Sequence, residues 1–217
     1  MIVDLHLKGN QVIVVGAGNE GMKKVKSLLT QDCKILVISN KSNSRIDSLV
    51  KSKKIKFKKL KLVNANFLAE YKPYLVMATT DDKELNHKIV HKAKKMNCYA
   101  YASDDPEISD FAYPSIINIE DTVQIAISTG GRSPVMAKKL KTKSEKFFRS
   151  LITKEDLSEI KLQKFARDIA SKKLDSQIKR KKFLYTILND KRVKELLKDR
   201  KYNSAKTRVK KMLGEWK

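Results

Sequence analysis

The chain has 217 residues, 41% of them apolar and 33% charged, which is enough for one large domain or two small ones with a hydrophobic core. It has no run of ~18 apolar residues, so we expect no membrane-spanning helix, and residues 1–8 lack the basic and apolar regions of a secretory signal. Two cysteines, Cys33 and Cys98, are too few for a disulfide framework or a four-cysteine zinc site, and reduced thiols in a cytoplasmic protein are the simplest interpretation.

The chain is strongly basic, because 48 lysine and arginine residues against 24 aspartate and glutamate residues give a net charge of +24. This charge fits a polyanionic partner: nucleic acid, anionic lipid, or a small molecule with many carboxylates. The alternative is a lysine-rich composition whose charges are simply solvated. Residues 138–217 hold 27 basic and 10 acidic residues, against 21 and 14 in residues 1–137, so we expect the two parts to differ in role.

The first hundred residues alternate between strand and helix patterns. Five segments have the apolar pattern of a strand: 11–15, 34–38, 55–62, 74–78 and 98–101. Three segments have apolar residues at helical spacing: 22–29, 46–50 and 85–96. This alternation is typical of an α/β, Rossmann-like domain with a parallel sheet and helices on both faces, which we place at residues 1–112.

The pattern changes after this domain. Residues 115–119 and 122–128 are two strand patterns on either side of a short turn, which predicts an antiparallel hairpin. Ser133 and Pro134 are a favourable N-cap and first residue for the next helix, which runs towards residue 148. We therefore expect a hairpin-and-helix region at residues 113–150 and a basic, helical C-terminal region at residues 151–217.

A glycine-rich turn, Gly16-Ala17-Gly18-Asn19-Glu20-Gly21, follows the first predicted strand and opens the first predicted helix. In this context the GxGxxG pattern is typical of a dinucleotide-binding turn. Gly16 permits the tight turn, Gly18 lets the backbone approach a pyrophosphate, and Gly21 allows close packing of helix and strand. The N–H groups at the helix start, around Asn19 and Glu20, would face the phosphates. The alternative is a glycine turn that holds no ligand.

The acidic residue that commonly binds the ribose, about 20 residues after such a turn, is missing here. The second strand is followed instead by Asn40 and Lys41. Asn40 could still hydrogen-bond a ribose hydroxyl, whereas Lys41 and Arg45 could meet a 2′-phosphate. The residues therefore favour a dinucleotide and leave the choice between NAD and NADP open.

Thr79-Thr80-Asp81-Asp82 follows the fourth predicted strand, at the sheet edge that faces the cofactor crevice in a doubly wound fold. Thr79 and Thr80 could contact the dinucleotide. Asp81 or Asp82 could equally be the N-cap of the helix at 85–96, and we favour the cap for at least one of them.

Ser103-Asp104-Asp105-Pro106 follows the fifth strand at the same edge. A carboxylate here would lie near a nicotinamide and could act as a general base. The alternative is a turn, since Asp-Asp-Pro is favourable turn chemistry, and composition alone does not decide between the two. Asp105 precedes Pro106, so its backbone should be extended and its side chain should serve the turn.

His87 and His91 lie four residues apart on a predicted helix, a spacing that can ligate a metal ion, but no third ligand follows nearby. We therefore expect a solvated helix face and no metal site. Both cysteines flank buried strands, so we expect core thiols rather than nucleophiles.

Several of these motifs occur together in a fixed order. They are Leu7-Lys8-Gly9-Asn10, Val14-Val15-Gly16-Ala17-Gly18, Ala78-Thr79-Thr80-Asp81-Asp82 with Asn86, Asp104-Asp105-Pro106 with Asp110-Phe111, Tyr113-Pro114-Ser115, and Ala126-Ile127-Ser128-Thr129-Gly130-Gly131 with Ser133-Pro134. The set spans residues 2–148 and resembles the precorrin-2 dehydrogenase module of siroheme synthases. The chain departs from that family at Gly21, where many relatives have alanine, and at Tyr101-Ala102, where many have Asn-Val.

The resemblance implies oxidation of precorrin-2 to sirohydrochlorin, with NAD as the cofactor, in siroheme biosynthesis. It also implies a homodimer formed through the hairpin region, and it makes Asp104 the key aspartate. Some members of the family also insert iron. The implied substrate is a tetrapyrrole with eight carboxylates, which a lysine-rich cleft would attract, although this explains only part of the basic charge.

Ser128-Thr129-Gly130-Gly131-Arg132 lies between the predicted hairpin and the following helix. Its hydroxyls, its backbone N–H groups and the side chain of Arg132 could bind a propionate or acetate group. The alternative is a plain turn and cap. We favour the ligand because the resemblance includes this loop, so Ser128, Thr129, Gly130 and Arg132 are the predicted substrate-binding residues.

The leading functional prediction is precorrin-2 dehydrogenation, with hydride passing to the nicotinamide and Asp104 taking the proton or orienting the ring. One alternative is a bifunctional enzyme that also inserts iron into sirohydrochlorin. Another is a Rossmann module that senses a nucleotide without chemistry. We expect no nucleic-acid partner, because the basic helices lack a basic motif interleaved with aromatic residues. A tail that packs on the core or closes over the substrate explains its apolar stripes better.

Overall fold

The computed structural model describes residues 2–216, which fall into two units that divide between Tyr113 and Pro114. This boundary lies one residue after the expected one, because the ring of Tyr113 packs in the first unit against Tyr101 and Phe111. The further boundary that we expect at residue 150 stays a prediction.

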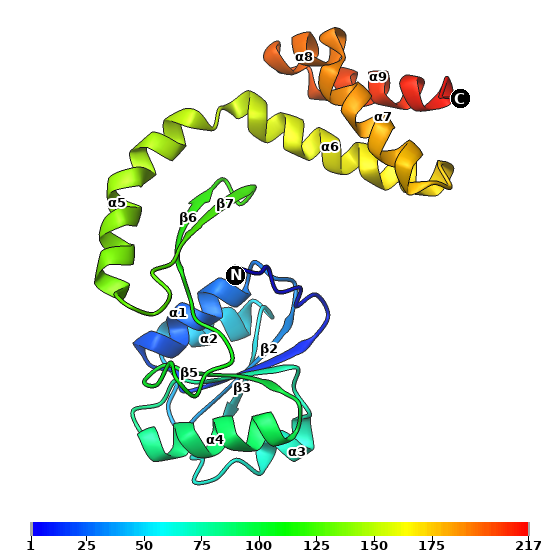
Figure 1. The fold of residues 1–217 in the computed structure, drawn as a ribbon. Helices are drawn as coiled ribbons and strands as arrows, with labels where there is room; N and C mark the ends of the chain where they lie inside the picture. The colour runs from blue at the N-terminus through cyan, green and yellow to red at the C-terminus, as the bar shows by residue number, and fades with distance from the viewer. Residues whose placement is uncertain (1, 217) are drawn as a thin grey trace. The chain divides into compact units, whose positions relative to one another are not determined.

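A five-stranded parallel sheet forms the centre of the first unit, with strand order β3-β2-β1-β4-β5 (Figure 1). Its strands are β1 (Gln11–Val15), β2 (Lys34–Ser39), β3 (Lys56–Lys59), β4 (Leu75–Ala78) and β5 (Tyr99–Ala102). Each predicted strand is present. β3 is shorter than the predicted segment 55–62, because it pairs only with β2 at the edge of the sheet and Leu60 beyond it is exposed.

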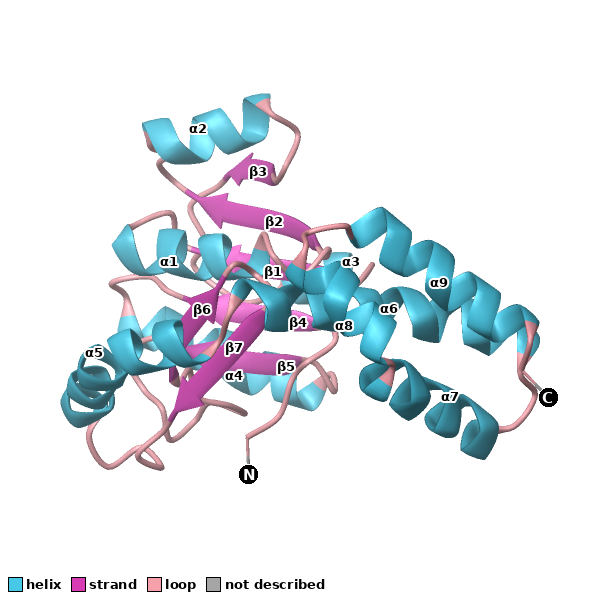
Figure 2. Cartoon of the chain, turned by 90° about the horizontal axis from the view of Figure 1, so that it is seen from above, coloured by secondary structure: helices cyan, strands magenta, loops and turns pink. Residues whose placement is uncertain are grey.

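Four helices cover the two faces of this sheet: α1 (Asn19–Leu28), α2 (Ser44–Lys51), α3 (Phe67–Tyr71) and α4 (Lys83–Lys95). α1 and α2 lie on one face and α3 and α4 on the other (Figures 1 and 2). Alternate strand residues supply the two cores, so that Val14 packs on the α1 side and its neighbour Ile13 on the α4 side. Burial on both faces explains why the central strands are apolar throughout, and it confirms the α/β, Rossmann-like class.

An antiparallel hairpin, β6 (Ser115–Ile119) and β7 (Val123–Ile127), begins the second unit. Ser133 then caps α5 (Pro134–Leu151), with Pro134 as its first residue. Both elements confirm the predictions for this segment.

Four further helices complete the second unit: α6 (Lys154–Lys173), α7 (Gln177–Asn189), α8 (Lys191–Lys198) and α9 (Tyr202–Gly214). They enclose an apolar core in which Leu162, Phe183 and Val209 are fully buried. The C-terminal region is therefore helical, as expected. Within residues 2–216, no helix is both long enough and apolar enough to cross a membrane.

Candidate active site

The carboxyl ends of the central strands lie side by side, because their register is aligned. Val15, the last residue of β1, pairs with Ala78 of β4, which pairs with Ala102 of β5. The strand order reverses between β1 and β4, which is where doubly wound folds bind their ligands. Gly16 and Thr79 follow these two strands directly, so the predicted site residues of the first unit gather at this edge.

The glycine turn is closely packed at two of its three glycines. Gly16 has a φ of +104°, and a Cβ there would lie 2.7 Å from the carbonyl oxygen of Thr79. A Cβ on Gly21 would overlap the carbonyl oxygen of Gly16. A side chain at either position would therefore distort the turn, and the glycine at position 21 suits this close packing.

Gly18 differs from the other two glycines. It is the exposed N-cap of α1, its φ of −71° and ψ of −167° are open to any residue, and a Cβ there would have no neighbour within 4 Å. Asn19 and Glu20 follow it as the first residues of α1. Open space before an exposed glycine, at the N-terminus of a ten-residue helix, fits the pyrophosphate of a dinucleotide.

Thr79 supports the glycine turn from the β4 side. Its hydroxyl donates a hydrogen bond to the carbonyl oxygen of Val15 at 2.8 Å and lies 3.4 Å from that of Gly16. The residue is 6% exposed, and its hydroxyl is satisfied within the protein. Thr79 thus positions the turn, and its contact with a dinucleotide stays a prediction.

Asn43 links the connection between β2 and α2 to the glycine turn. Its Nδ2 donates to the carbonyl oxygen of Ala17 at 2.7 Å, while its Oδ1 accepts two N–H groups from the first turn of α2. Asn40 and Lys41, the residues predicted at the ribose, are exposed in this connection. The ribose-side residues and the glycine turn are therefore held together.

A fully buried amide, Asn86 on α4, joins the turns that follow β4 and β5. Its Oδ1 accepts hydrogen bonds from the N–H and the hydroxyl of Thr80, at 3.2 and 2.7 Å. Its Nδ2 donates to the carbonyl oxygen of Thr80 at 2.9 Å and to Oδ1 of Asp104 at 2.7 Å. Asp104 is an exposed residue, so the network fixes one carboxylate oxygen of a side chain that solvent can reach.

The neighbouring carboxylates serve local structure. Asp105 Oδ1 accepts the N–H of Glu107 at 3.0 Å, as expected for a turn, and its Oδ2 lies 3.1 Å from Nε2 of His87. Asp82 caps α4 by accepting the N–H of Leu85 at 2.9 Å, which confirms the predicted cap. Within residues 2–216, no three histidine, cysteine or carboxylate side chains group closely enough to hold a metal ion.

A buried lysine, Lys24 of α1, lies among aromatic rings. Its Nζ is 3.7 Å from the ring centroid of Tyr113 and 4.2 Å from that of Tyr101, and the residue is only 7% exposed. Burial lowers the pKa of Lys24 to about 8, although the nearby charge of Glu20 acts in the opposite direction. Burial also raises the pKa of Tyr113 to about 12. Cation–π attraction partly offsets the cost of burying this ammonium group.

Sequence reasoning gave no role to Asn86 and did not single out Lys24, yet a signal for both was present. Each occupies the buried stripe of its helix. Lys24 shares that stripe with Gly21, Val25 and Leu28, and Asn86 shares it with Ile89, Val90 and Ala93. A polar residue at a core position of an apolar stripe needs a partner, and this spacing could have identified both.

The predicted substrate loop belongs to the second unit. The hydroxyl of Thr129 accepts the N–H of Ser133 at 3.0 Å and donates to its carbonyl oxygen, and Ser128 Oγ accepts the N–H of Gly130 at 3.1 Å. These bonds shape the turn before α5. The side chain of Arg132 forms no ion pair within residues 2–216, and the residue is exposed. Ligand binding by this loop stays a prediction.

Comparison with protein families gives two matches. A family model described as "Putative NAD(P)-binding" matches residues 3–115, more than half of the chain. A second model, described as the central domain of a sirohaem biosynthesis protein, matches residues 121–143.

Curated relatives and a solved structure are also similar. The siroheme synthase of Actinobacillus pleuropneumoniae serotype 7 is 34% identical over 141 residues, and that of Neisseria meningitidis serogroup C is 31% identical over 142. These matches cover 65% and 64% of this chain but only 28% of each relative. A solved structure titled "SirC, precorrin-2 dehydrogenase" covers 97% of this chain and 99% of its own, with a TM-score of 0.68 and 20% identity, so it has the same fold.

Proposed function

This chain belongs to the NAD(P)-binding family whose model it matches over residues 3–115, and from that premise we propose that it is an NAD-dependent dehydrogenase that oxidises precorrin-2 to sirohydrochlorin in siroheme biosynthesis. The similarity to siroheme synthases, together with the family match in the second unit, supports a place in siroheme biosynthesis. The fold shared with a protein titled precorrin-2 dehydrogenase supports the reaction. We propose a cytoplasmic location, where Cys33 and Cys98 remain free thiols.

One observation carries the proposal. The carboxylate of Asp104 is held by Asn86 at the same sheet edge as the glycine turn, two residues beyond the end of β5. A carboxylate that is fixed at one oxygen and exposed to solvent can accept a proton from a bound substrate. Because Asn86 also binds Thr80, its side chain joins the two turns at this edge.

The oxidation removes a hydride and a proton from the macrocycle. When bound, the nicotinamide ring of NAD accepts the hydride. Gly18 would hold the pyrophosphate at the start of α1, and Asn40 would bind the ribose. Asp104 would accept the proton, with Asn86 as the residue that orients its carboxylate. The basic charge of the chain would attract the acidic tetrapyrrole. The loop with Ser128 and Arg132 in the second unit is a separate proposal, as a loop whose groups can bind a carboxylate.

The roles of the two adjacent aspartates test the proposal. In anaerobic turnover with precorrin-2 and NAD, Asp104→Ala should lower kcat by about 10²-fold or more, because the proton acceptor is lost. Asp105→Ala is the matched control, since it removes the same chemical group from a turn residue and should lower kcat far less. NAD affinity should be intact in both variants. Normal turnover by Asp104→Ala would remove this residue from the reaction.

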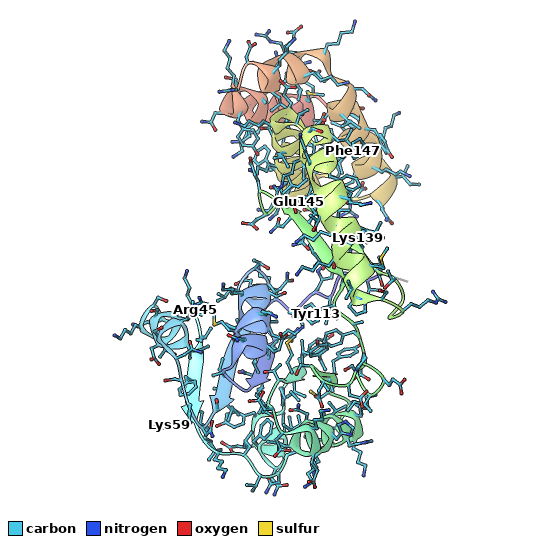
Figure 3. All side chains as sticks on the ribbon, turned by 90° about the vertical axis from the view of Figure 1, so that its left-hand side faces the viewer. Arg45, Lys59, Tyr113, Lys139, Glu145 and Phe147 are labelled. Carbon is cyan, nitrogen blue, oxygen red and sulfur yellow. The ribbon has the colours of Figure 1, made fainter. Side chains whose placement is uncertain are left out.

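We also propose that the chain is a homodimer. Four large apolar side chains form an exposed stripe on α5, at a spacing that keeps them on one face: Met136, Leu140, Phe147 and Leu151. Their exposed fractions run from 43% to 60%, and Figure 3 shows Phe147 on this helix. Exposed large apolar side chains on one face of a helix are typical of an interface, and a second copy of the chain would cover them.

A further inference from the structure

We propose that Lys24 is a substrate-binding residue, whose ammonium group pairs with one of the carboxylates of the tetrapyrrole beside Asp104. The inference deepens the proposed function and rests on it, because the tetrapyrrole is the proposed substrate. It concerns the part of the first unit where α1, β5 and the residues after β5 meet.

The first observation is a buried charge without an acidic partner. Buried ammonium groups in proteins are ordinarily paired with a carboxylate. Within residues 2–216, Lys24 forms no ion pair and no hydrogen bond, although it is only 7% exposed. Glu20, the one acidic residue of α1, pairs instead with Lys23. The fold therefore leaves this charge for a partner from outside the described chain.

The second observation is that the tip of this side chain is open while its stem is buried. In the part of the chain that the structure describes, Nε of Arg208 is the one side-chain polar atom that is sealed from solvent without a hydrogen bond. Nζ of Lys24 has no hydrogen bond either, so it keeps contact with solvent. The rings of Tyr113 and Tyr101 cover it on two sides but do not neutralise it. An anion can therefore reach the ammonium group from the side that the rings leave open.

The third observation places this ammonium group beside the proposed proton acceptor. Helical side chains lean towards the N-terminus of their helix, so Lys24 extends towards the glycine turn. Its partner ring, Tyr101, is the penultimate residue of β5, and Asp104 lies two residues beyond the end of that strand. Burial raises the pKa of Tyr101, and the charges of Glu20 and Asp104 raise it further. Asp104 is therefore within electrostatic reach of the ring that Lys24 contacts.

The direction in which Lys24 faces favours a carboxylate of the substrate over a phosphate of the dinucleotide. The proposed pyrophosphate site is at Gly18, on the exposed start of α1. Lys24 instead faces β5 and Tyr113, in the segment that follows this strand (Figure 3). A substrate that gives its proton to Asp104 must lie on this side, and a carboxylate binds an ammonium group through charge-assisted hydrogen bonds. A charge that the fold destabilises is also typical of a functional site.

The charge of Lys24 makes this pairing dependent on pH. Burial lowers its pKa to about 8, Glu20 acts in the opposite direction, and Lys23 lowers it further. The groups that face it from the other elements are Tyr101 and Tyr113. Burial raises the pKa of both, that of Tyr113 to about 12, so their phenols stay neutral. Below pH 8 the ammonium group is charged and binds the carboxylate, and above pH 8 the free protein loses this charge and the affinity falls.

The test is anaerobic titration of the full chain with sirohydrochlorin, the proposed product, which keeps the carboxylates of the substrate. At pH 7, Lys24→Met should weaken this binding by roughly 10- to 100-fold, as expected for lost hydrogen bonds between charged groups, and should change NAD affinity by less than about threefold. The matched control is Lys26→Met, which removes the same charge from an exposed residue of the same helix and should leave both affinities unchanged.

Two further measurements separate substrate binding from a structural role. In turnover, Lys24→Met should raise the KM for precorrin-2 and leave kcat near that of the wild type, in contrast to Asp104→Ala. The affinity of the wild type for sirohydrochlorin should fall by about tenfold between pH 7 and 9.5, and Lys24→Met should lose this dependence. The pH series on the wild type needs no substitution, so it tests the inference even if the variant folds poorly.

The inference is overturned if Lys24→Met and Lys26→Met lose affinity for sirohydrochlorin equally, or if neither loses any. A loss of NAD affinity in place of sirohydrochlorin affinity would assign the ammonium group to the dinucleotide and overturn it as well. If the wild type binds sirohydrochlorin through Lys24 but does not oxidise precorrin-2, the proposed dehydrogenase fails and the binding site stands. The two failures are therefore distinguishable.

Discussion

Asn86 and Lys24 are polar side chains at positions of their helices that otherwise hold core residues. The amide of Asn86 has hydrogen-bond partners on both of its polar atoms, so its burial costs little and fixes the position of Asp104. Lys24 has aromatic faces but no carboxylate within ion-pair distance among the described residues, so its charge carries a cost. The stability of the fold should therefore depend on pH through the ammonium group of Lys24, and not through the uncharged amide of Asn86.

Lys24 gives a prediction about stability. Its pKa of about 8 in the folded state lies below the ordinary value of 10.5, so the charged form is penalised by folding below pH 8. Between pH 8 and 10.5 the folded state loses this proton first, and the penalty disappears. The free energy of unfolding of the wild type, relative to Lys24→Met, should therefore rise by up to about 3 kcal/mol between pH 7 and 10.

Urea denaturation of both proteins across this pH range measures that difference. Lys26→Met is the control, because it makes the same substitution at an exposed residue of the same helix. A wild-type-to-Lys24→Met difference that stays constant from pH 7 to 10 would contradict the buried, destabilised ammonium group.

Local chemistry was predictable at the residue scale, and long-range contacts were not. The cap at Asp82 and the turn role of Asp105 depend on residues within three positions, and both predictions are confirmed. The bond from Asn86 to Asp104 joins residues 18 positions apart. It depends on how β5 lies beside α4, which spacing along the chain does not specify.

At the scale of elements, the glycine turn and α1 form one structure, and its three glycines are explained in different ways. The fold itself requires Gly16 and Gly21, since a Cβ at either position would clash with backbone atoms. It does not require Gly18, because the backbone there is ordinary and the space beside it is open. A glycine that the fold does not require, at the start of a helix, is best explained by a ligand.

This contrast predicts opposite results for two substitutions. Gly18→Val should leave the protein folded but lower dinucleotide affinity by on the order of 10²-fold, because the side chain would occupy the approach of the phosphate. Gly16→Ala should destabilise the fold by about 1–3 kcal/mol or more, because it combines a positive φ with a clash. Thermal unfolding and NAD titration of both variants measure these effects. Unchanged NAD affinity in folded Gly18→Val would contradict the assignment of the turn.

Long periodic elements were predictable, and the shortest helix was missed. The sheet strands, α1, α2, α4 and α5 follow apolar spacing or a capping signal. α3 has only five residues, of which Phe67 and Leu68 are buried, and this is too short to reveal a helical period. The β3 segment was predicted too long because the alternation of lysine with apolar residues continues past the point where pairing with β2 ends.

At the scale of the whole molecule, the stripe on α5 makes the oligomeric state a testable property. Phe147→Glu should convert the proposed dimer to a monomer, because it buries a charge in an apolar interface. Thr142→Glu adds the same charge at an exposed position on another face of α5 and should leave the dimer intact. Sedimentation at micromolar concentration distinguishes the two. A wild type that sediments as a monomer would contradict the dimer.

The central claim is that this chain couples oxidation of precorrin-2 to reduction of NAD. The most direct test is anaerobic incubation of the full chain with both compounds, in which the absorbance of NADH and of sirohydrochlorin is followed together. The account predicts that both products form, with one NADH for each sirohydrochlorin. Unchanged precorrin-2, under conditions where titration shows that NAD is bound, would contradict the account and leave a nucleotide-binding module without this chemistry.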